Sequence, residues 1–385
     1  MLTTTPRILL ATAMRMHDQV VGIAQYASQA HWHLDLKHYF SGEIHSTWKG
    51  EGIITMLGEN SELTKFIQTM LPTMPIVCLS SNCEDMDIPY VDFDSEEIGK
   101  IAAFHFIERD FKNYAFYSHN DWPVSALRGT SYSKHIKQAG HSSQTIVWTR
   151  KKGRRKNTWD NRQKWLKQEL AKLPKPLAMF TADDMHATEI IEACMELNYK
   201  IPDTVAILGV GNFELFSNCR IVGLSSICVD IYQHGYEAAR LLEGLIQGKK
   251  PPTQPILIKP TGIKVRKSTD TIATEHPALN LAIRFMLDNY HESIAIEDIV
   301  KSSRISQSLL YQLFKKHFKQ SPVHFLTAIR LKKAKELLRE SNLKITAIAH
   351  KCGFGNPVNL FRTFQRFEGI TPKKYRETTP SQACQ

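Results

Sequence analysis

The chain has 385 residues, of which 42% are hydrophobic and 23% are charged. This length predicts two or three domains, and the composition excludes a largely disordered, collagen-like or coiled-coil protein. The sequence has no apolar run of 18 residues, which argues against a membrane-spanning helix. Its seven scattered cysteines form no Cys-x-x-Cys pair and suit no closed disulfide framework, so we expect a reducing, cytoplasmic compartment.

From Arg7 to about Lys259, short apolar runs alternate with stretches of helical periodicity. Such alternation predicts parallel sheets covered by helices on both faces, and the number of elements favours two α/β lobes over one. The predicted strands are Ile8–Ala13, Leu34–Phe40, Gly52–Met56, Ile76–Ser80, Tyr114–Tyr117, Ile146–Trp148, Ala178–Thr181, Val205–Leu208 and Gly223–Ile227. The predicted helices are Asp18–Ala30, Ser95–Arg109, Leu127–Ala139, Asp160–Leu173, Asp184–Asn198 and Tyr232–Gln247.

Beyond Pro277 the strand signals stop, and every further element is predicted to be helical. The preceding stretch Lys264–His276 is rich in Thr and charge and has no period, which is typical of a linker. The predicted division is therefore an α/β part at residues 1–262, a linker at 263–276 and an all-α part at 277–380.

The positive charge of the chain lies in its last part. Residues 276–385 hold 18 Lys and Arg against 8 Asp and Glu, a net charge of +10, whereas residues 1–275 hold 31 against 30. A compact basic domain is typical of a protein that binds nucleic acid, although a charge surplus for solubility gives the same sum.

A helix-turn-helix pattern occurs twice in the helical part. In the first unit the short helix Glu297–Ser303 precedes a second helix that is capped by Ser306 and packs through Leu310 and Phe314. In the second unit the short helix Ile345–Lys351 precedes a helix with Asn356 as its cap and an inward face. That inward face is predicted to consist of Leu360, Phe361, Phe364 and Phe367.

The outer faces of the two second helices carry amide, hydroxyl and cationic side chains, which can bind base edges and phosphates in a major groove. The candidate DNA-binding residues are Gln307, Ser308, Tyr311, Gln312, Lys315, Asn356, Asn359, Arg362, Thr363 and Arg366. The helix predicted at Pro322–Ser341 is ~30 Å long, close to the ~34 Å of one DNA turn, and could place both units in successive grooves. The alternative is an ordinary small helical bundle with solvated charges.

These residues resemble the C-terminal signature of AraC-type transcription regulators. The resemblance covers about residues 278–378 and includes Ile345–Phe354, Thr371-Pro372 and Tyr375. It implies a double helix-turn-helix DNA-binding domain. Lys319 stands where the family usually has a helix-ending Gly, so we expect a strained or differently built turn there.

The first 260 residues resemble the ligand-binding domain of LacI-type repressors and periplasmic sugar-binding proteins, on Phe180–Ala187, Ile201–Asp203 and Val205–Gly209. The resemblance implies a two-lobed α/β sensor for a sugar such as xylose. Gly211 stands where those relatives usually have an Asp that accepts hydrogen bonds from sugar hydroxyls. The candidate ligand-binding residues are Asp18, Trp122, Arg128, Asp183, Asn212 and Asp230. In the alternative interpretation Trp122 is a surface-loop residue and Arg128 forms a structural ion pair.

Together these features predict a ligand-controlled, sequence-specific transcription regulator, with activation favoured over repression. The expected partners are a double-stranded DNA operator, a small sugar, a second copy of the chain and RNA polymerase. No catalytic residue, metal ligand, cofactor or membrane partner is predicted. Two rivals stay open: a carbohydrate-binding enzyme with a basic accessory domain, and a DNA-binding regulator whose sensor takes a non-sugar ligand or a protein.

Overall fold

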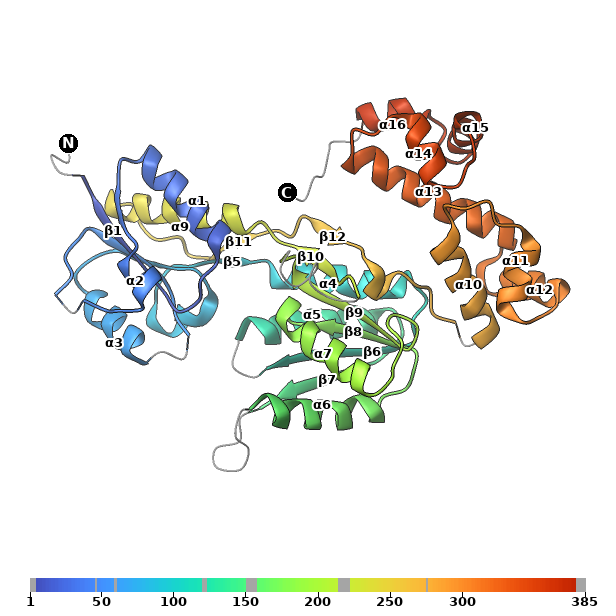
Figure 1. Cartoon of the computed structure of the whole chain (residues 1–385). Helices are drawn as coiled ribbons and strands as arrows, with labels where there is room; N and C mark the ends of the chain where they lie inside the picture. The colour runs from blue at the N-terminus through green and yellow to red at the C-terminus, as the bar shows by residue number, and fades with distance from the viewer. Residues whose placement is uncertain are drawn as a thin grey trace.

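The computed structural model describes residues 5–45, 47–58, 61–119, 123–149, 158–213, 222–274 and 276–378. The chain forms an N-terminal lobe, a C-terminal lobe and a separate helical domain, as Figure 1 shows from blue to red. The predicted fold class, two α/β lobes followed by an all-α double helix-turn-helix domain, is confirmed.

The N-terminal lobe is built on a parallel sheet of order β2-β1-β3-β4, with the pair β11-β5 beside it. Every residue of the central strand β3 is buried, because helices cover both faces of the sheet. The elements are β1 (Arg7–Thr12), α1 (His17–Gln29), β2 (His33–Asp35), α2 (Lys37–Ser41), β3 (Gly52–Met56), α3 (Ser61–Met70), β4 (Ile76–Cys78), the 3-10 helix η1 (Ser81–Met86), β5 (Val91–Phe93), α9 (Ile231–Ile246) and β11 (Ile256–Ile258).

The C-terminal lobe has a six-stranded sheet of order β12-β10-β9-β8-β6-β7, in which only the edge strand β12 is antiparallel. Its elements are α4 (Ser95–Ile107), β6 (Asn113–His119), α5 (Pro123–Gln138), β7 (Ser143–Trp148), α6 (Trp159–Lys172), β8 (Leu177–Thr181), α7 (Asp184–Glu196), β9 (Val205–Gly211), β10 (Ser225–Cys228), β12 (Gly262–Lys264) and the 3-10 helix η2 (Lys267–Thr269).

The chain crosses between the lobes three times, after β5, β10 and β11. Helix α9 therefore follows a strand of the C-terminal lobe but packs on α1 in the N-terminal lobe. The two helices approach closely because each has a glycine at the contact. A Cβ on Gly22 would lie 2.1 Å from Tyr232 O, and one on Gly235 would lie 2.0 Å from Gln19 O.

Three features of the α/β part differ from the sequence-based expectations. The strand predicted at Leu34–Phe40 ends at Asp35, and helix α2 follows, because Asp35 accepts a hydrogen bond from the Lys37 backbone N–H at 3.1 Å and turns the chain. The short strands β5, β11 and β12 carry too few residues to show a period. Cys78 and Cys83 form a disulfide, although none was expected, because the strand and the 3-10 helix that follows it bring their Cα atoms to 6.3 Å.

The stretch expected to be a linker is partly built into the C-terminal lobe. β12 pairs with β10, and η2 packs against β9 and β10. Ser268 and Thr269 of η2 are fully buried. Ser268 Oγ donates to Ile207 O at 2.6 Å, and Thr269 Oγ1 bonds Ser225 Oγ at 2.8 Å. The polar side chains that suggested a linker thus form hydrogen bonds inside the lobe.

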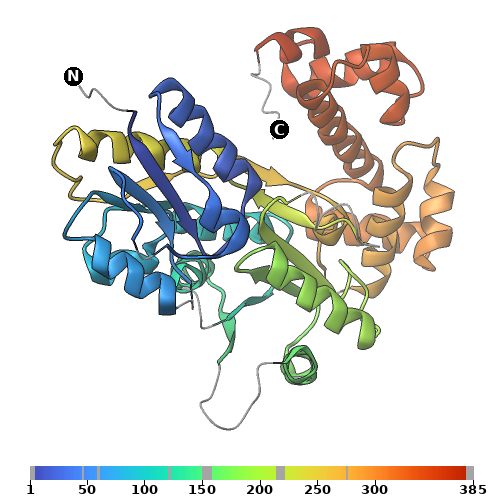
Figure 2. The ribbon, with the colours of Figure 1, turned by 60° about the vertical axis from the view of Figure 1, so that its left-hand side comes forward.

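The helical domain contains α10 (Pro277–Asn289), α11 (Ile296–Ser303), α12 (Gln307–Phe318), α13 (Pro322–Glu340), α14 (Ile345–Lys351), α15 (Pro357–Glu368) and α16 (Pro372–Thr378). It has two hydrophobic cores, one around Phe314 and one around Phe364. Figure 2 shows α13 as the long helix between the two halves. Its first half packs in the first core through Phe325, and its second half packs in the second core through Leu338.

The helical domain contacts the C-terminal lobe through α10. Arg284 Nη1 donates to Asp270 O at 3.1 Å and lies 3.8 Å from the carboxylate of Asp203. The backbone N–H of Ala273 donates to Arg109 O at 2.8 Å. Asp203 lies in the turn between α7 and β9, so this turn of the C-terminal lobe adjoins the helical domain.

Candidate DNA-binding surface and ligand cleft

The first helix-turn-helix unit consists of α11 and α12. Arg304 ends α11 in the left-handed conformation with a φ of 57°, and Ser306 caps α12 by accepting the Leu309 N–H at 3.3 Å. Leu310 and Phe314 are fully buried on the inner face of α12. The structure exposes all five candidate DNA-binding residues of this helix, Gln307, Ser308, Tyr311, Gln312 and Lys315.

The second unit consists of α14 and α15. Asn356 caps α15 by accepting the Asn359 N–H at 2.9 Å, as predicted, and Leu360 and Phe364 are fully buried. Asn356, Asn359, Arg362 and Arg366 are exposed, and Thr363 is half-buried. Asn359 Nδ2 also donates to Phe354 O at 3.1 Å, so part of this amide is used within the turn.

The prediction that Phe361 and Phe367 turn inward is wrong, because both side chains are 44% exposed. One residue along a helix is a rotation of about 100°, which carries Phe361 away from the buried face at Leu360. Phe367 lies in the last turn of α15, where its ring contacts the ring of His324 with a centroid distance of 6.2 Å. The outer surface of α15 is therefore more apolar than the sequence suggested.

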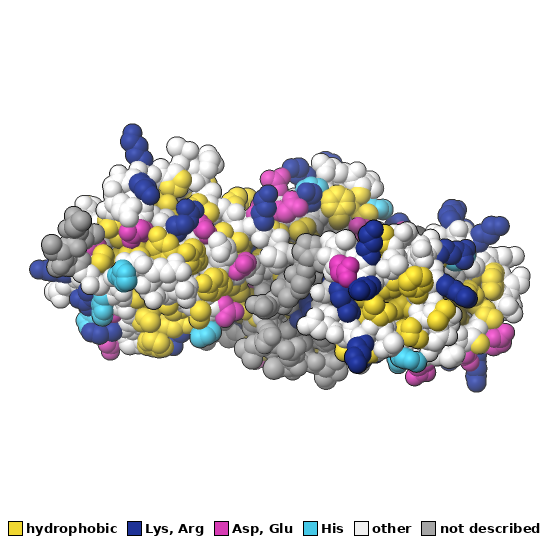
Figure 3. Space-filling model, turned by 90° about the horizontal axis from the view of Figure 1, so that it is seen from above, with side chains coloured by type: hydrophobic (Ala, Val, Ile, Leu, Met, Phe, Trp, Pro, Cys, Tyr) yellow, Lys and Arg dark blue, Asp and Glu magenta, His cyan; other side chains and the backbone are white. Residues whose placement is uncertain are grey.

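Helix α13 connects the two units. Its 19 residues span ~28 Å, somewhat less than the ~34 Å of one DNA turn. Figure 3 shows Lys and Arg side chains gathered over the helical domain at its right, with hydrophobic side chains between them. A basic surface around two exposed recognition helices is what binding to the phosphates and grooves of DNA requires.

The candidate ligand site lies at the carboxyl ends of β6, β8 and β9, where loops of an α/β lobe converge. Arg128 projects from α5 and is only 9% exposed, and its Nη1 donates to Ala182 O. Burial lowers the pKa of Arg128, and the nearby carboxylates of Asp92, Asp183 and Asp184 oppose that effect. A buried guanidinium among three carboxylates gives this edge of the sheet a built polar centre.

Asp183 caps α7 by accepting the His186 N–H at 2.8 Å, and the same oxygen contacts His186 Nδ1 at 2.7 Å. Burial would raise its pKa, but His186 and Arg128 hold the pKa below the ordinary value. Its side chain is 35% exposed, so the ionised carboxylate remains accessible. His186 in turn packs edge-on against His119 at 4.3 Å between ring centroids, and His119 Nε2 contacts Glu189 at 3.1 Å. The sequence did not indicate this cluster, because His119 lies on β6, far along the chain from His186 and Glu189 of α7.

A second carboxylate, Asp184, lies next to Asp183 and was not among the predicted ligand-binding residues. It is fully buried and accepts the Ser226 hydroxyl at 2.6 Å and the Phe213 N–H at 3.0 Å. Burial raises the pKa of Asp184 to about 6. A Cβ on Gly209 would lie 2.2 Å from Asp184 Oδ1, so this glycine makes room for the carboxylate.

The Asp that the relatives usually have could not simply replace Gly211. Its φ is 123°, and a Cβ there would lie 2.4 Å from the Phe213 ring, so an Asp at this position would strain the backbone and clash. The next residue, Asn212, accepts Arg266 Nη2 at 2.8 Å and donates its N–H to Ser226 Oγ at 2.9 Å. Three candidate residues thus lie at this edge of the C-terminal lobe, namely Arg128, Asp183 and Asn212.

The remaining candidates lie elsewhere. Asp18 is exposed in the first turn of α1, after the carboxyl end of β1 in the N-terminal lobe. Asp230 caps α9 by accepting the Gln233 N–H at 2.8 Å, directly after the crossover from β10. Trp122 lies outside the described residues.

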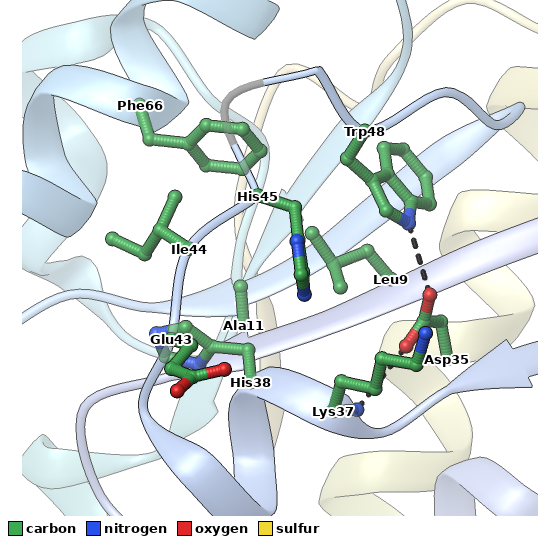
Figure 4. Close-up of a pocket in the computed structure, with 10 residues that line it drawn as sticks. All are labelled: Leu9, Ala11, Asp35, Lys37, His38, Glu43, Ile44, His45, Trp48 and Phe66. Atoms are coloured by element: carbon green, nitrogen blue, oxygen red, sulfur yellow. Dashed lines mark hydrogen bonds between the residues drawn. The ribbon is translucent and has the colours of Figure 1, made fainter.

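A separate hollow lies in the N-terminal lobe under α2 (Figure 4). His45, Trp48 and Phe66 line it, and Trp48 Nε1 donates to Asp35 at 3.2 Å. Its volume is about 10 Å³, which is room for a single water molecule and not for a sugar.

No helix of the described residues is long and apolar enough to cross a membrane. Within the same residues, no three His, Cys, Asp or Glu side chains are grouped to hold a metal ion.

Comparisons with known proteins agree with this architecture. Residues 103–269 match a family described as a periplasmic binding protein-like domain, and residues 299–378 match a helix-turn-helix domain. The xylose operon regulatory protein of Escherichia coli K12 is 26% identical over 98% of both chains. The solved structure of a xylose-binding transcription activator, xylR, covers 99% of this chain and all of its own, with a TM-score of 0.69 and 24% identity. A transcriptional regulator CelR in complex with cellobiose covers 68% of this chain and 84% of its own, with a TM-score of 0.54 and 18% identity.

The likeness to the xylose operon regulator spans both parts of the chain in the same order, and the two resemblances predicted from the sequence are confirmed. The chain is a DNA-binding transcription regulator that joins a periplasmic binding protein-like domain to a helix-turn-helix domain.

Proposed function

We propose that this regulator is controlled by a small sugar that binds in the cleft between the two lobes, with the pentose xylose as the first sugar to test. The observation that carries the proposal is the set of polar side chains at the strand ends of the C-terminal lobe, with Arg128 and Asp183 beside the end of β8 and Asn212 after the end of β9. Charged and amide groups of this kind donate to and accept from sugar hydroxyls. The relatives that match over the whole chain are named for the xylose operon.

Asp183 is the acceptor on which sugar binding depends in this proposal. Both hydrogen bonds to its side chain end on Oδ1, and Oδ2 faces no other partner among the described residues. Charge-assisted hydrogen bonds contribute ~1.5–3 kcal/mol each. Asp18 of the N-terminal lobe and Asp230 at the crossover before α9 are proposed to contact the sugar when the lobes close. Trp122 is proposed as a further contact.

The sugar is proposed to act on DNA binding through α7. Asp183 lies at the start of this helix, and the turn after its end carries Asp203, which faces Arg284 of α10. The 13 residues of α7 span ~20 Å and, together with the turn that carries Asp203, are proposed to connect the ligand site to the DNA-binding domain. Removal of the Arg284 side chain (Arg284→Ala) is expected to weaken the effect of sugar on operator affinity without abolishing sugar binding.

The proposed partners are a DNA operator with two half-sites, a second copy of the chain and, for an activator, RNA polymerase. Two half-sites favour a dimer, because tethering the second binding event multiplies the affinity. Light scattering of the protein with operators of one and two half-sites measures this directly. A single chain on the two-site operator would contradict the dimer.

Two measurements test the proposed function. Titration calorimetry with pentoses, hexoses and sugar acids identifies the ligand, and we expect binding of a pentose that Asp183→Asn removes. DNA binding by the full-length protein is expected to weaken steeply as salt rises, because counterions are released from phosphates. Turnover of a sugar without DNA affinity would favour the rival enzyme, and DNA binding without any sugar response would favour a non-sugar ligand.

A further inference from the structure

Helix α15 presents two apolar side chains to solvent in its first two turns. Val358 is 55% exposed and Phe361 is 44% exposed. They lie three residues apart on adjacent parts of the helix surface, and Arg362 follows Val358 by four residues, so the three side chains form one continuous patch. Leu360 and Phe364 are buried in the core and do not belong to this patch.

This patch lies where a recognition helix contacts bases. In helix-turn-helix proteins the N-terminal residues of the second helix contact base edges in the major groove. Val358 and Phe361 can neither donate nor accept a hydrogen bond, so they cannot satisfy the amino, carbonyl or ring-nitrogen groups of a base. The 5-methyl group of thymine is the apolar group that the major groove displays.

The first unit lacks such a patch at the matching place. The first two turns of α12 present Gln307, Ser308 and Gln312, which are polar and exposed. Leu309 and Tyr311 are less exposed, at 36% and 37%, and the Tyr hydroxyl keeps a hydrogen-bonding end. The two recognition helices thus offer different chemistry to DNA.

We infer that Val358 and Phe361 are specificity-determining residues that read thymine methyl groups, next to a base pair contacted by Arg362. This inference rests on the proposed DNA-binding function and adds the kind of base that the second unit selects. A methyl group that leaves water against these side chains raises affinity about three- to fivefold. A cytosine at the same place loses the methyl contact and buries its amino group against apolar side chains.

The experiment uses the full-length protein and an operator obtained by selection from random DNA. Each thymine of the operator is replaced singly by deoxyuridine, which removes the 5-methyl group and changes no hydrogen-bonding group. We expect one or two thymines in each half-site whose replacement weakens binding about three- to fivefold, measured by fluorescence anisotropy. In Val358→Ala and Phe361→Ala proteins the same replacements should have a smaller effect, because the partner of the methyl group is gone.

Leu281→Ala provides the matched control. Leu281 is 46% exposed on α10, outside both recognition helices, so its removal should leave every deoxyuridine effect unchanged. Cytosine at the sensitive position should bind weakly, and 5-methylcytosine should recover part of the loss. Equal deoxyuridine effects in wild type and both α15 variants, or none at any thymine, would overturn the inference while sequence-specific binding persists. Absence of sequence-specific binding would overturn the proposed function as well.

Discussion

The two helix-turn-helix units reach the same arrangement with different residues at their turns. In the first unit the left-handed positions that end α11 and α12 are occupied by Arg304 and Lys319, both with a φ of 57°. In the second unit the corresponding positions are Gly353 and Gly369, with φ of 72° and 71°. A left-handed residue with a side chain costs ~1–2 kcal/mol relative to a helical one, whereas glycine adopts this conformation freely.

The difference has a structural reason at Gly353. A Cβ there would lie 2.0 Å from Tyr290 O, at the end of α10, so the turn of the second unit packs directly on α10. Arg330 Nε donates to the same carbonyl at 2.8 Å. Lys319, by contrast, is exposed. A glycine is thus required at the turn that packs on α10, while the exposed turns tolerate a side chain at some cost in stability.

The largest effect is expected for Gly353→Ala. Strain in the left-handed conformation and overpacking against Tyr290 O should together destabilise the helical domain by about 3 kcal/mol. The free energy of unfolding in urea, followed by the helical signal of the full-length protein, measures this. A loss below ~1 kcal/mol would show that the turn can move away from α10.

Base reading is expected to divide between the units. Arg362→Ala should lose ~1–3 kcal/mol of discrimination at one or two base pairs. Gln312→Ala should relax preference at different base pairs of the same half-site, because it lies on the other recognition helix. Replacement of Lys319 by Ala should weaken all sequences alike, since a lysine at the helix end contacts phosphate. Binding to a library of single-base operator variants distinguishes these patterns, and uniform losses in all three proteins would disprove the assigned reading faces.

The smallest effects concern the exposed turns and should have opposite signs. Lys319→Gly relieves the left-handed strain and should stabilise the domain by about 0.5–1 kcal/mol, after the entropy cost of glycine is subtracted. Gly369→Ala introduces the same strain without a clash, because its Cβ would meet nothing within 4 Å, and should destabilise by about 1 kcal/mol. Urea unfolding of both variants measures these changes, and effects of the same sign would contradict the comparison.

The helical domain could be predicted in more detail than the cleft. Caps such as Ser306 and Asn356, and the buried positions Leu310 and Leu360, follow from local pattern and are confirmed. The exposure of Phe361 could not be predicted from its hydrophobicity, because an exposed aromatic residue and a buried one look the same in a sequence. The helical periodicity could have indicated it, because Phe361 is one residue, or about 100° of rotation, beyond the buried Leu360.

The cleft depends on contacts between distant strands, which a single sequence does not show. Asp183 was predicted as a ligand-binding residue, whereas the buried Asp184 was not among the candidates. Its partner Ser226 is 42 residues away, on β10. Gly211 likewise suggested a missing carboxylate, and only its φ and its contact with Phe213 show that the loop has a different backbone.

The most direct test of a sugar-controlled regulator is the operator affinity of the full-length protein as xylose is titrated, for wild type and Asp183→Asn. Asn retains the ability to cap α7, so the variant changes the charge in the cleft and keeps the helix start. We expect xylose to change the wild-type affinity for DNA by at least about fivefold, the lower end of typical coupling between sites. The Asp183→Asn protein should bind DNA equally well without sugar and show no response to it. An equal response in both proteins would contradict the role of Asp183, and a wild-type affinity that no sugar alters would contradict sugar control itself.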